Sequence, residues 1–446
     1  MLHILTNRTY ARLFTAQIVA LLGTGLLTIA LGLTAYDLAG ERAGQVLGLA
    51  LTIKMLAYVG LSPVATALVA RFDRRRVLIG ADLVRMAAAL CLPFIDAAWQ
   101  IYLLIFVLQA ASATFTPTFQ AVIPDVLPAE ADYTRALSLS RLAYDLENLI
   151  SPVLAGILLA LIAPSGLYAG TALGFVLSAA LVASTRLPAT GARTDRPFRE
   201  RLTNGSRIYL ATPRLRGLLA LNLTVASTGA VVIVLSVVIA RSVYGGADSA
   251  LAVALGAYGV GSMLVALGLP RLLDRMPDRP VMLGAGALAA LTMTGLGVEV
   301  ILTGWPSWPV FLTLWGVIGA ALAGILTPAG RLLRRSARPQ DRPAVFAAQF
   351  ALSHACWLIA YPAAGLLGGW IGLGPTMAAL GVLGLASVAL ARAVWPAGSP
   401  ETLEHAHSGL PPDHPHLKGA VRRGGVWVHR HAFVIDDEHR VWPTSG

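Results

Sequence analysis

The sequence predicts an all-α polytopic membrane protein of twelve transmembrane helices, built as two six-helix repeats with a short cytoplasmic C-terminal tail. Of its 446 residues, 56% are hydrophobic and 13% are charged, and the mean hydropathy is +0.69. A water-soluble chain of this length would be less apolar. Apolar stretches of roughly 20 or more residues, each long enough to cross a bilayer core, recur almost to the C-terminus.

The twelve expected spans follow from these stretches. In chain order they cover residues 10–36, 44–70, 77–95, 99–121, 138–163, 166–186, 215–240, 249–269, 281–303, 306–328, 343–369 and 375–394. The first span is too long for the apolar region of a cleavable signal peptide, so we expect it to be retained as the targeting element. Cys91 and Cys356 both fall inside expected helices, so no disulfide framework is predicted.

The basic residues are sorted by side, within a formal net charge of +11. The opposite side keeps only Arg42 and Arg241 in its loops, whereas the side of the two termini carries Arg8, Arg12, Arg71, Arg74, Arg75, Arg76, Arg135, the run 186–216, Arg271, Arg275, Arg279, Arg331, Arg334, Arg335, Arg338 and Arg342. This positive-inside pattern predicts a bacterial cytoplasmic (inner) membrane with both termini cytoplasmic. No basic patch is interleaved with aromatic residues, so nucleic acid is not an expected partner.

An internal repeat divides the helices into six plus six. We expect four regions: an N-terminal bundle (1–187), a cytoplasmic linker (188–214), a C-terminal bundle (215–395) and a His-rich cytoplasmic tail (396–446). A shift of 204 residues superposes the loop between the second and third helices of one half on that of the other. The matched pairs include Arg71 with Arg275, Arg75 with Arg279, Val77 with Val281 and Gly80 with Gly284. Halves related in this way bind their solute at their interface near the bilayer midplane.

The repeated loop resembles the signature of the major facilitator superfamily, and the resemblance covers about residues 5–394. The first copy departs from the signature at Thr66 and Ala70, where a glycine and an aspartate are usual, while the second keeps the Asp-Arg pair. The resemblance implies gating loops or charge networks at Arg71, Asp73, Arg75, Asp82, Arg85, Asp274, Arg275 and Arg279.

A second resemblance favours export. The stretch 151–156 is similar to the fifth-helix motif of antiporters, which is represented here by Ser151, Pro152, Ala155 and Gly156. The segment 117–152 resembles the enterobactin-exporter and macrolide-efflux group, most closely its nickel-resistance branch, whose members also carry a His-rich tail.

Charged residues inside the spans are candidate functional groups, because each costs at least ~2.5 kcal/mol to insert. Lys54 and Tyr58 form a polar stripe that should face the central cavity, although a lysine can also snorkel to the interface. In the fifth helix, Arg141 and Asp145 can pair on one face, which leaves Glu147, beside Asn148, for Lys54, a proton or a cation. A purely structural network is the alternative.

Histidines provide the candidate metal ligands. His354, two residues before Cys356, has donor chemistry that suits nickel, cobalt or zinc, although packing is the commoner role for such a pair. The tail contains three His-x-His pairs, which could each chelate one divalent ion in an extended chain: His405 with His407, His414 with His416, and His429 with His431. A disordered, solvated tail is the alternative, and a small hairpin around Asp436 and Asp437 is a further expectation.

These observations predict proton-driven efflux by alternating access, with a divalent metal ion such as nickel as the leading solute. The alternative is export of an amphipathic drug or siderophore, and a non-transporting sensor is disfavoured because the tail is too small to hold an effector domain. No Walker loop, nucleophile elbow or HExxH motif occurs, so we expect neither an enzyme nor a cofactor. The expected partners are membrane lipid, protons and the solute, with the chain acting as a monomer.

Overall fold

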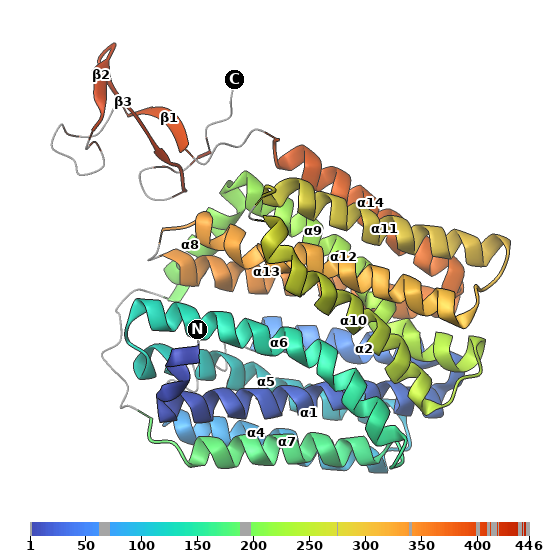
Figure 1. Ribbon diagram of the computed structural model, residues 1–446. Coiled ribbons are helices and arrows are strands. Elements are labelled where there is room, and N and C mark those ends of the chain that lie inside the picture. Colours follow the sequence, from blue (N-terminus) through green and yellow to red (C-terminus); the bar gives the residue numbers. More distant parts are fainter. Residues whose placement is uncertain are drawn as a thin grey trace.

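The computed structural model describes residues 2–61, 72–187, 198–273, 275–338, 341–397, 402–407, 411, 417, 419–435, 439 and 441–442. Helices dominate these residues (Figure 1). The first half contains α1 (Arg8–Ala39), α2 (Ala43–Leu56), α4 (Arg74–Cys91), α5 (Ala98–Val126), α6 (Glu130–Leu159) and α7 (Gly166–Ala183). The second half contains α9 (Pro213–Val238), α10 (Asp248–Leu273), α11 (Asp278–Leu302), α12 (Trp308–Arg335), α13 (Arg342–Trp370) and α14 (Leu373–Val394).

Shorter helices extend or connect the long ones. They are η1 (Leu2–Thr6), η2 (Gly40–Arg42), η3 (Ala57–Leu61), η4 (Leu92–Phe94), η5 (Ile239–Val243) and α8 (Phe198–Ala211). Helix α8 lies in the expected linker and docks on the second half, where the Tyr209 hydroxyl donates a hydrogen bond to Gln349 of α13. Burial raises the pKa of Tyr209, so the hydroxyl keeps the proton that this hydrogen bond needs.

The predicted membrane fold is confirmed. Among the described residues, ten continuous helical segments are long and apolar enough to cross a membrane, and the first of them, Arg8–Val59, contains both α1 and α2. Large apolar side chains on the flank are exposed, for example Leu264 at 69% and Leu302 at 75%, as expected of a surface that faces lipid.

Helix ends follow local chemistry. The Asn7 side chain caps α1 by accepting hydrogen bonds from the backbone N–H groups of Thr9 (3.0 Å) and Tyr10 (3.1 Å). Asp73 caps α4 in the same way through the N–H of Arg76 (2.9 Å). Gly40 stops α1 with a φ of +55°, a conformation that favours glycine.

The two halves meet through equivalent helices. The second helix of each half packs on the fifth helix of the other, so α2 contacts α13 and α10 contacts α6. Gly48 and Gly365 allow the α2–α13 approach, because a methyl group at Gly48 would lie 2.8 Å from the Tyr361 carbonyl oxygen and 2.9 Å from the Gly365 Cα. This exchange of partners is what the sequence repeat implies for two related bundles.

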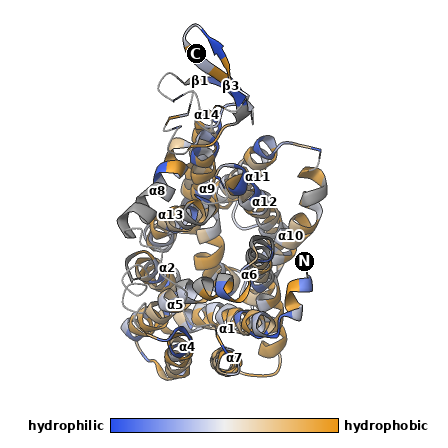
Figure 2. Cartoon of the chain, turned by 90° about the vertical axis from the view of Figure 1, so that its left-hand side faces the viewer, coloured by the Kyte–Doolittle hydropathy of each residue, from blue (hydrophilic) through white to orange (hydrophobic). Residues whose placement is uncertain are grey.

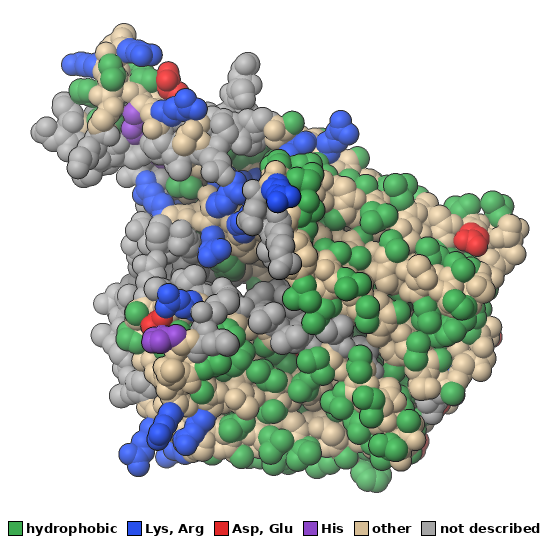
Figure 3. All heavy atoms as spheres, viewed as in Figure 1, with side chains coloured by type: hydrophobic (Ala, Val, Ile, Leu, Met, Phe, Trp, Pro, Cys, Tyr) green, Lys and Arg blue, Asp and Glu red, His purple; other side chains and the backbone are tan. Residues whose placement is uncertain are grey.

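The two ends of the bundle differ in charge. We call the end that holds the start of α4, the end of α12, helix α8 and the tail the basic end, because Lys and Arg side chains gather there (Figure 3). Figure 2 looks onto this end, so that many of the helices are seen nearly end-on. At the far end the halves touch directly: the Tyr36 hydroxyl lies 2.8 Å from Ser242 Oγ, and Arg241 pairs with Asp37 at 3.8 Å.

The described part of the tail forms a small antiparallel sheet. Its strands β1 (Thr402–His407), β2 (Val421–Arg423) and β3 (Val426–Ala432) stand in the order β1-β3-β2. The hairpin turns at Gly424 and Gly425, both with positive φ, whereas the expected turn at 436–437 lies outside the described residues. Phe433 and Ile435 are buried in the hydrophobic core that the second half contributes to, so the tail packs against the bundle.

Candidate functional site

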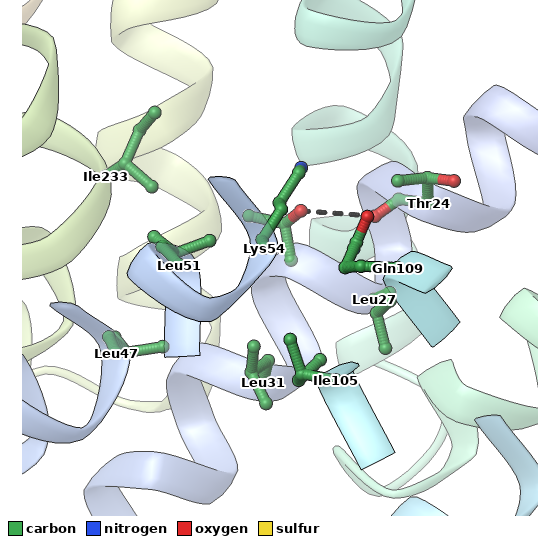
Figure 4. Close-up of a pocket in the computed structure, with 10 residues that line it drawn as sticks. Thr24, Leu27, Leu31, Leu47, Leu51, Lys54, Ile105, Gln109 and Ile233 are labelled. Atoms are coloured by element: carbon green, nitrogen blue, oxygen red, sulfur yellow. Dashed lines mark hydrogen bonds between the residues drawn. The ribbon is translucent and has the colours of Figure 1, made fainter. Parts of the chain in front are cut away.

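A pocket opens around Lys54, at the interface between the two halves (Figure 4). Its empty space is about 430 Å³, part of which is open to the outside. Helices α1, α2, α5 and α9 line it through Thr24, Leu27, Thr28, Leu31, Leu47, Leu51, Lys54, Ile105, Gln109 and Ile233. In the close-up, the aliphatic residues Leu51 and Ile233 lie on one side of Lys54 and the polar residues Thr24 and Gln109 on the other. The pocket is therefore apolar with one polar, cationic wall.

The ammonium group of Lys54 makes no hydrogen bond or ion pair within the part of the chain that the structure describes. Its charge nevertheless interacts with the carboxylate of Glu147 on α6 and with His354 on α13. Glu147 lies against α1, where its Cγ is 3.5 Å from the position that a Cβ at Gly25 would occupy. The three predicted residues therefore gather around the same space from three different helices.

An aromatic group borders this space on the second-half side. The Tyr58 ring lies 5.7 Å from the His354 ring and 6.1 Å from the Phe350 ring. The rings of Phe350 and His354 are 3.9 Å apart. His354 Nδ1 donates to the Phe350 carbonyl at 2.7 Å, so in the neutral ring Nε2 carries the lone pair. The predicted stripe of Lys54 and Tyr58 thus reaches helix α13 of the other half.

Helix α6 supplies a further polar atom. The Ser151 hydroxyl is buried against Gly25 of α1 and has no hydrogen-bond partner among the described residues. Ala155 is fully buried, and a Cβ at Gly156 would lie 3.5 Å from Ala252 of α10. The antiporter-like motif therefore lies where α6 meets both α1 and the second half. The side chains of Arg141, Asp145, Asn148 and Pro152 lie outside the described part, so the expected pairing of Arg141 with Asp145 remains a prediction.

A buried ion pair lies inside the first half. Asp82 and Arg85 pair with each other on α4, and Ser178 of α7 donates a hydrogen bond to Asp82 Oδ2 at 2.8 Å. The Arg85 guanidinium also covers the rings of Phe115 (4.2 Å) and Phe175 (4.6 Å). All these groups belong to one half, so the arrangement favours the structural interpretation of this pair over gating.

At the basic end, each half joins the start of its third helix to the end of its fourth. In the first half Arg74 pairs with Asp125. In the second half Asp278 pairs with Arg331, and with Arg335 at 3.0 Å. Residues 74 and 278 correspond under the 204-residue shift, so the two halves carry the same bridge with its charges exchanged. The sequence analysis missed Asp125 and Asp278, although the acid at 278 stands opposite a basic residue in the repeat.

Three of the other expected gating residues, Asp73, Arg75 and Arg279, make contacts at helix ends. Arg75 donates to the Ala183 carbonyl, and Arg279 donates to the Trp395 carbonyl at 2.6 Å, so both fasten the start of the third helix to the end of the sixth. Asp73 is the α4 cap described above, and Arg275 is exposed. Arg71 and Asp274 lie outside the described residues.

Sequence reasoning missed part of the pocket. Gln109, Thr24 and Thr28 line it, and Phe350 packs on His354. Gln109 left a signal, since an amide in the middle of an apolar span must find a polar partner or a cavity. The threonine hydroxyls gave no such signal in the sequence, because a threonine can hydrogen-bond within its own helix. Thr28, for example, donates to the Thr24 carbonyl at 3.1 Å.

The structure brings only some of the expected metal ligands close to one another. Cys356 is buried and donates weakly to the Leu352 carbonyl, so it is bonded within its own helix, as His354 is. In the tail, His405 and His429 are cross-strand neighbours. The side chains of His407 and His431, and all of His414 and His416, lie outside the described residues. Among the described residues, no group of three His, Cys, Asp or Glu is already arranged as a metal site.

Two six-helix halves that enclose a pocket at their interface define a polytopic transport protein. Two overlapping regions, residues 13–298 and 217–435, match the Major Facilitator Superfamily. The chain belongs to this superfamily. Its fold is similar to that of a bacterial homologue of the human lysosomal transporter Spinster in an inward-facing and unoccupied conformation (TM-score 0.68, 15% identity, 87% of this chain and 97% of that one). It is also similar to a D-xylose-proton symporter (TM-score 0.65, 12% identity, 88% and 97%).

The curated relatives include efflux proteins. Macrolide efflux protein A of Streptococcus pyogenes is 27% identical over 188 residues, which are 41% of this chain and 46% of that protein. The macrolide efflux protein A of Enterococcus faecalis is 28% identical over 145 residues, 31% and 45% of the two chains. The chain thus spans less than half the length of these relatives.

Proposed function

We propose that the chain is a secondary active exporter that moves an amphipathic organic molecule out of the cell in exchange for protons. The pocket at the interface of the halves is the observation that carries this proposal. Six of its ten described lining residues are leucine or isoleucine, which suit an apolar solute. The similarity to macrolide efflux proteins supports the direction of transport.

The chemistry of the pocket favours an organic solute over a metal ion. None of the ten described lining residues carries a carboxylate, an imidazole or a thiol, the groups that bind nickel, cobalt or zinc. Among those ten residues, the one charged group is the ammonium of Lys54, which repels a divalent cation. Gln109 and the threonine hydroxyls instead offer hydrogen bonds that fix the orientation of a larger molecule.

Glu147 and Lys54 provide a way to couple the solute to protons. When Glu147 is ionised it neutralises the charge of Lys54, and an apolar solute can occupy the pocket. When Glu147 takes a proton, the ammonium is left without compensation and holds water, which opposes the solute. Solute and proton therefore exclude each other, as exchange transport requires. The antiporter-like stretch on the same helix is consistent with this scheme, and Asp145 remains a further candidate for the proton.

The proposed setting is a bacterial cytoplasmic membrane with the basic end inside, because arginine-rich loops stay on the cytoplasmic side. Export of a divalent metal ion such as nickel is the second candidate. The observation that favours metal export is the group of histidines in the tail. The described residues that line the pocket offer no metal ligands.

Growth of an efflux-sensitive host carrying the gene separates the two candidates. We expect higher tolerance of amphipathic drugs and unchanged tolerance of nickel and cobalt. Tolerance of nickel alone would overturn the proposed solute class.

Coupling is tested in vesicles by substituting the acid. Glu147→Gln should lower proton-driven drug uptake into everted vesicles at least about tenfold, the effect of ~1.4 kcal/mol. Glu299→Gln is the matched control, because that acid is exposed and does not line the pocket. Full proton-driven uptake by the Glu147 variant would show that another group carries the proton.

A further inference from the structure

The hydroxyl of Ser151 on α6 is buried without a hydrogen-bond partner. Ser151 is 2% exposed, and its Oγ atom has no partner among the described residues. A serine inside a helix can donate to the carbonyl oxygen four residues earlier, as Ser112 of α5 does to Leu108 at 3.0 Å. A buried hydroxyl that makes no hydrogen bond destabilises the state that contains it. Ser151 is therefore a candidate to find its partner in another state of the transport cycle.

Helix α1 leaves room for this side chain but offers it no bond. A Cβ atom at Gly25 would lie 2.0 Å from Ser151 Oγ and 2.2 Å from Ser151 Cβ. Only a glycine at position 25 therefore allows Ser151 to lie against the α1 backbone. The backbone groups in the middle of a continuous helix are already hydrogen-bonded to one another. Helix α1 thus holds the hydroxyl in place and leaves its hydrogen free for another acceptor.

The carboxyl group of Glu147 lies within reach of that hydrogen. Glu147 precedes Ser151 by four residues, so the two side chains share one face of α6. The Glu147 Cγ atom is 3.5 Å from the same point beside Gly25 that Ser151 Oγ approaches to 2.0 Å. The carboxylate oxygens extend two bonds beyond Cγ, so rotation of the Glu147 side chain can bring one of them to the hydroxyl.

We propose that the Ser151 hydroxyl donates a hydrogen bond to the ionised carboxylate of Glu147 and is the positioning residue for that acid. The inference rests on the proposed role of Glu147 in proton coupling. Ser151 holds the carboxylate on the α1 side, while the charge of Lys54 acts on it from α2. A hydrogen bond to a carboxylate is about twice as strong as one to a neutral group, so the bond weakens when Glu147 takes its proton. Ser151 thereby favours the ionised form and sets the proton concentration at which exchange proceeds.

The other titratable groups around Glu147 are few. Lys54 acts on Glu147 directly, and His354 of α13 interacts with Lys54. Helix α1 has no titratable residue between positions 13 and 35, and α10 has only Tyr258 between positions 249 and 270. Further titratable residues on α5, α7 and the two preceding turns of α6 are Tyr102, Asp125, Tyr168, Arg141, Tyr144 and Asp145. Serine does not titrate, so any shift on removing its hydroxyl reports on a neighbouring group.

The pH dependence of proton-driven drug uptake into everted vesicles tests this role. Ser151→Ala should move the external pH of half-maximal uptake upward by about one unit, because the carboxylate loses a charge-assisted hydrogen bond. Ser151→Thr keeps a hydroxyl and should restore the parent midpoint, whatever its rate. Ser112→Ala is the matched control, since Ser112 is buried and bonded within its own helix. An unshifted midpoint in Ser151→Ala, or an equal shift in Ser112→Ala, would overturn the proposal.

Two further measurements separate this inference from folding and from the proposed function. Because Ser151 has no partner in this structure, Ser151→Ala should unfold in detergent at no lower temperature than the parent. Infrared spectroscopy can follow the carbonyl stretch of protonated Glu147, identified by its loss in Glu147→Gln, and its pH midpoint should shift equally without any transport. Full uptake by Glu147→Gln would refute the proposed coupling. Loss of uptake in that variant, with unshifted midpoints in Ser151→Ala, would refute only the role of Ser151.

Discussion

At the scale of single residues, two sets of membrane-embedded charges among the described side chains differ in kind. Asp82 and Arg85 pair with each other, with Ser178 and two aromatic rings around them, while the buried Arg85 Nε has no hydrogen-bond partner among the described residues. Lys54 and Glu147 do not form a direct pair within the described residues, although each feels the other's charge. A buried ion pair within one half holds the helices of that half together, whereas separated charges beside a pocket are available to a solute or a proton.

The buried pair should therefore matter for stability. Arg85→Ala leaves the Asp82 carboxylate buried without its partner, a change that costs about 3–5 kcal/mol. We expect a large fall in the unfolding temperature of the purified protein in detergent. Arg135→Ala is the control, since its pair with Asp132 has side chains 48% and 26% exposed and should contribute less than ~1 kcal/mol. Equal effects of the two substitutions would contradict the structural role of Arg85.

Lys54 should matter for transport instead. Lys54→Met removes the cationic wall of the pocket and the positive charge that interacts with Glu147, so we expect efflux of the drug to fall at least about tenfold with the protein still folded. Lys54→Arg keeps the charge and should retain a measurable part of the activity. If Lys54→Met transports at the parent rate, the lysine only snorkels.

At the scale of helices, the interface depends on glycine. Gly48 of α2 and Gly365 of α13 bring the two backbones together at a distance that no side chain would allow. Small residues serve this purpose in membranes because close packing replaces the hydrophobic effect between helices. The same helices present Lys54, Tyr58 and His354 to one another, so their spacing also sets the shape of the site.

A single methyl group tests this contact. Gly48→Ala should force α2 away from α13, because the new Cβ would meet backbone atoms that cannot turn aside. We expect the rate of drug efflux to fall severalfold, with smaller changes in expression. Gly295→Ala in α11 is the control, since a Cβ there meets nothing within 4 Å. Wild-type efflux by the Gly48 variant would show that the α2–α13 interface can accommodate the added methyl group.

At the scale of the whole molecule, the contacts between the halves are consistent with rocking about the pocket. The far end is joined by Tyr36 with Ser242 and by Asp37 with Arg241, whereas each bridge described at the basic end stays within its own half. Alternating access then requires the far end to separate during each cycle.

A covalent clamp at the far end should stop that cycle. In a variant with both native cysteines replaced by serine, Tyr36→Cys and Ser242→Cys can be joined by a short bismaleimide. We expect the joined protein to lose efflux, while either single cysteine treated with the same reagent keeps it. Continued transport by the clamped chain would mean that this end does not open.

The sequence by itself determined the helices, their division into six plus six and the sorting of charge. These properties are local or periodic: apolar length sets a span, and a fixed shift reveals the repeat. The tertiary structure decided which side chains meet. Asp278 and Arg331 are 53 residues apart, and His405 and His439 are 34 apart. Gln109 faces the pocket only because of how α5 packs. Such contacts depend on the rotation of one helix or strand against another, which hydropathy and motif spacing do not encode.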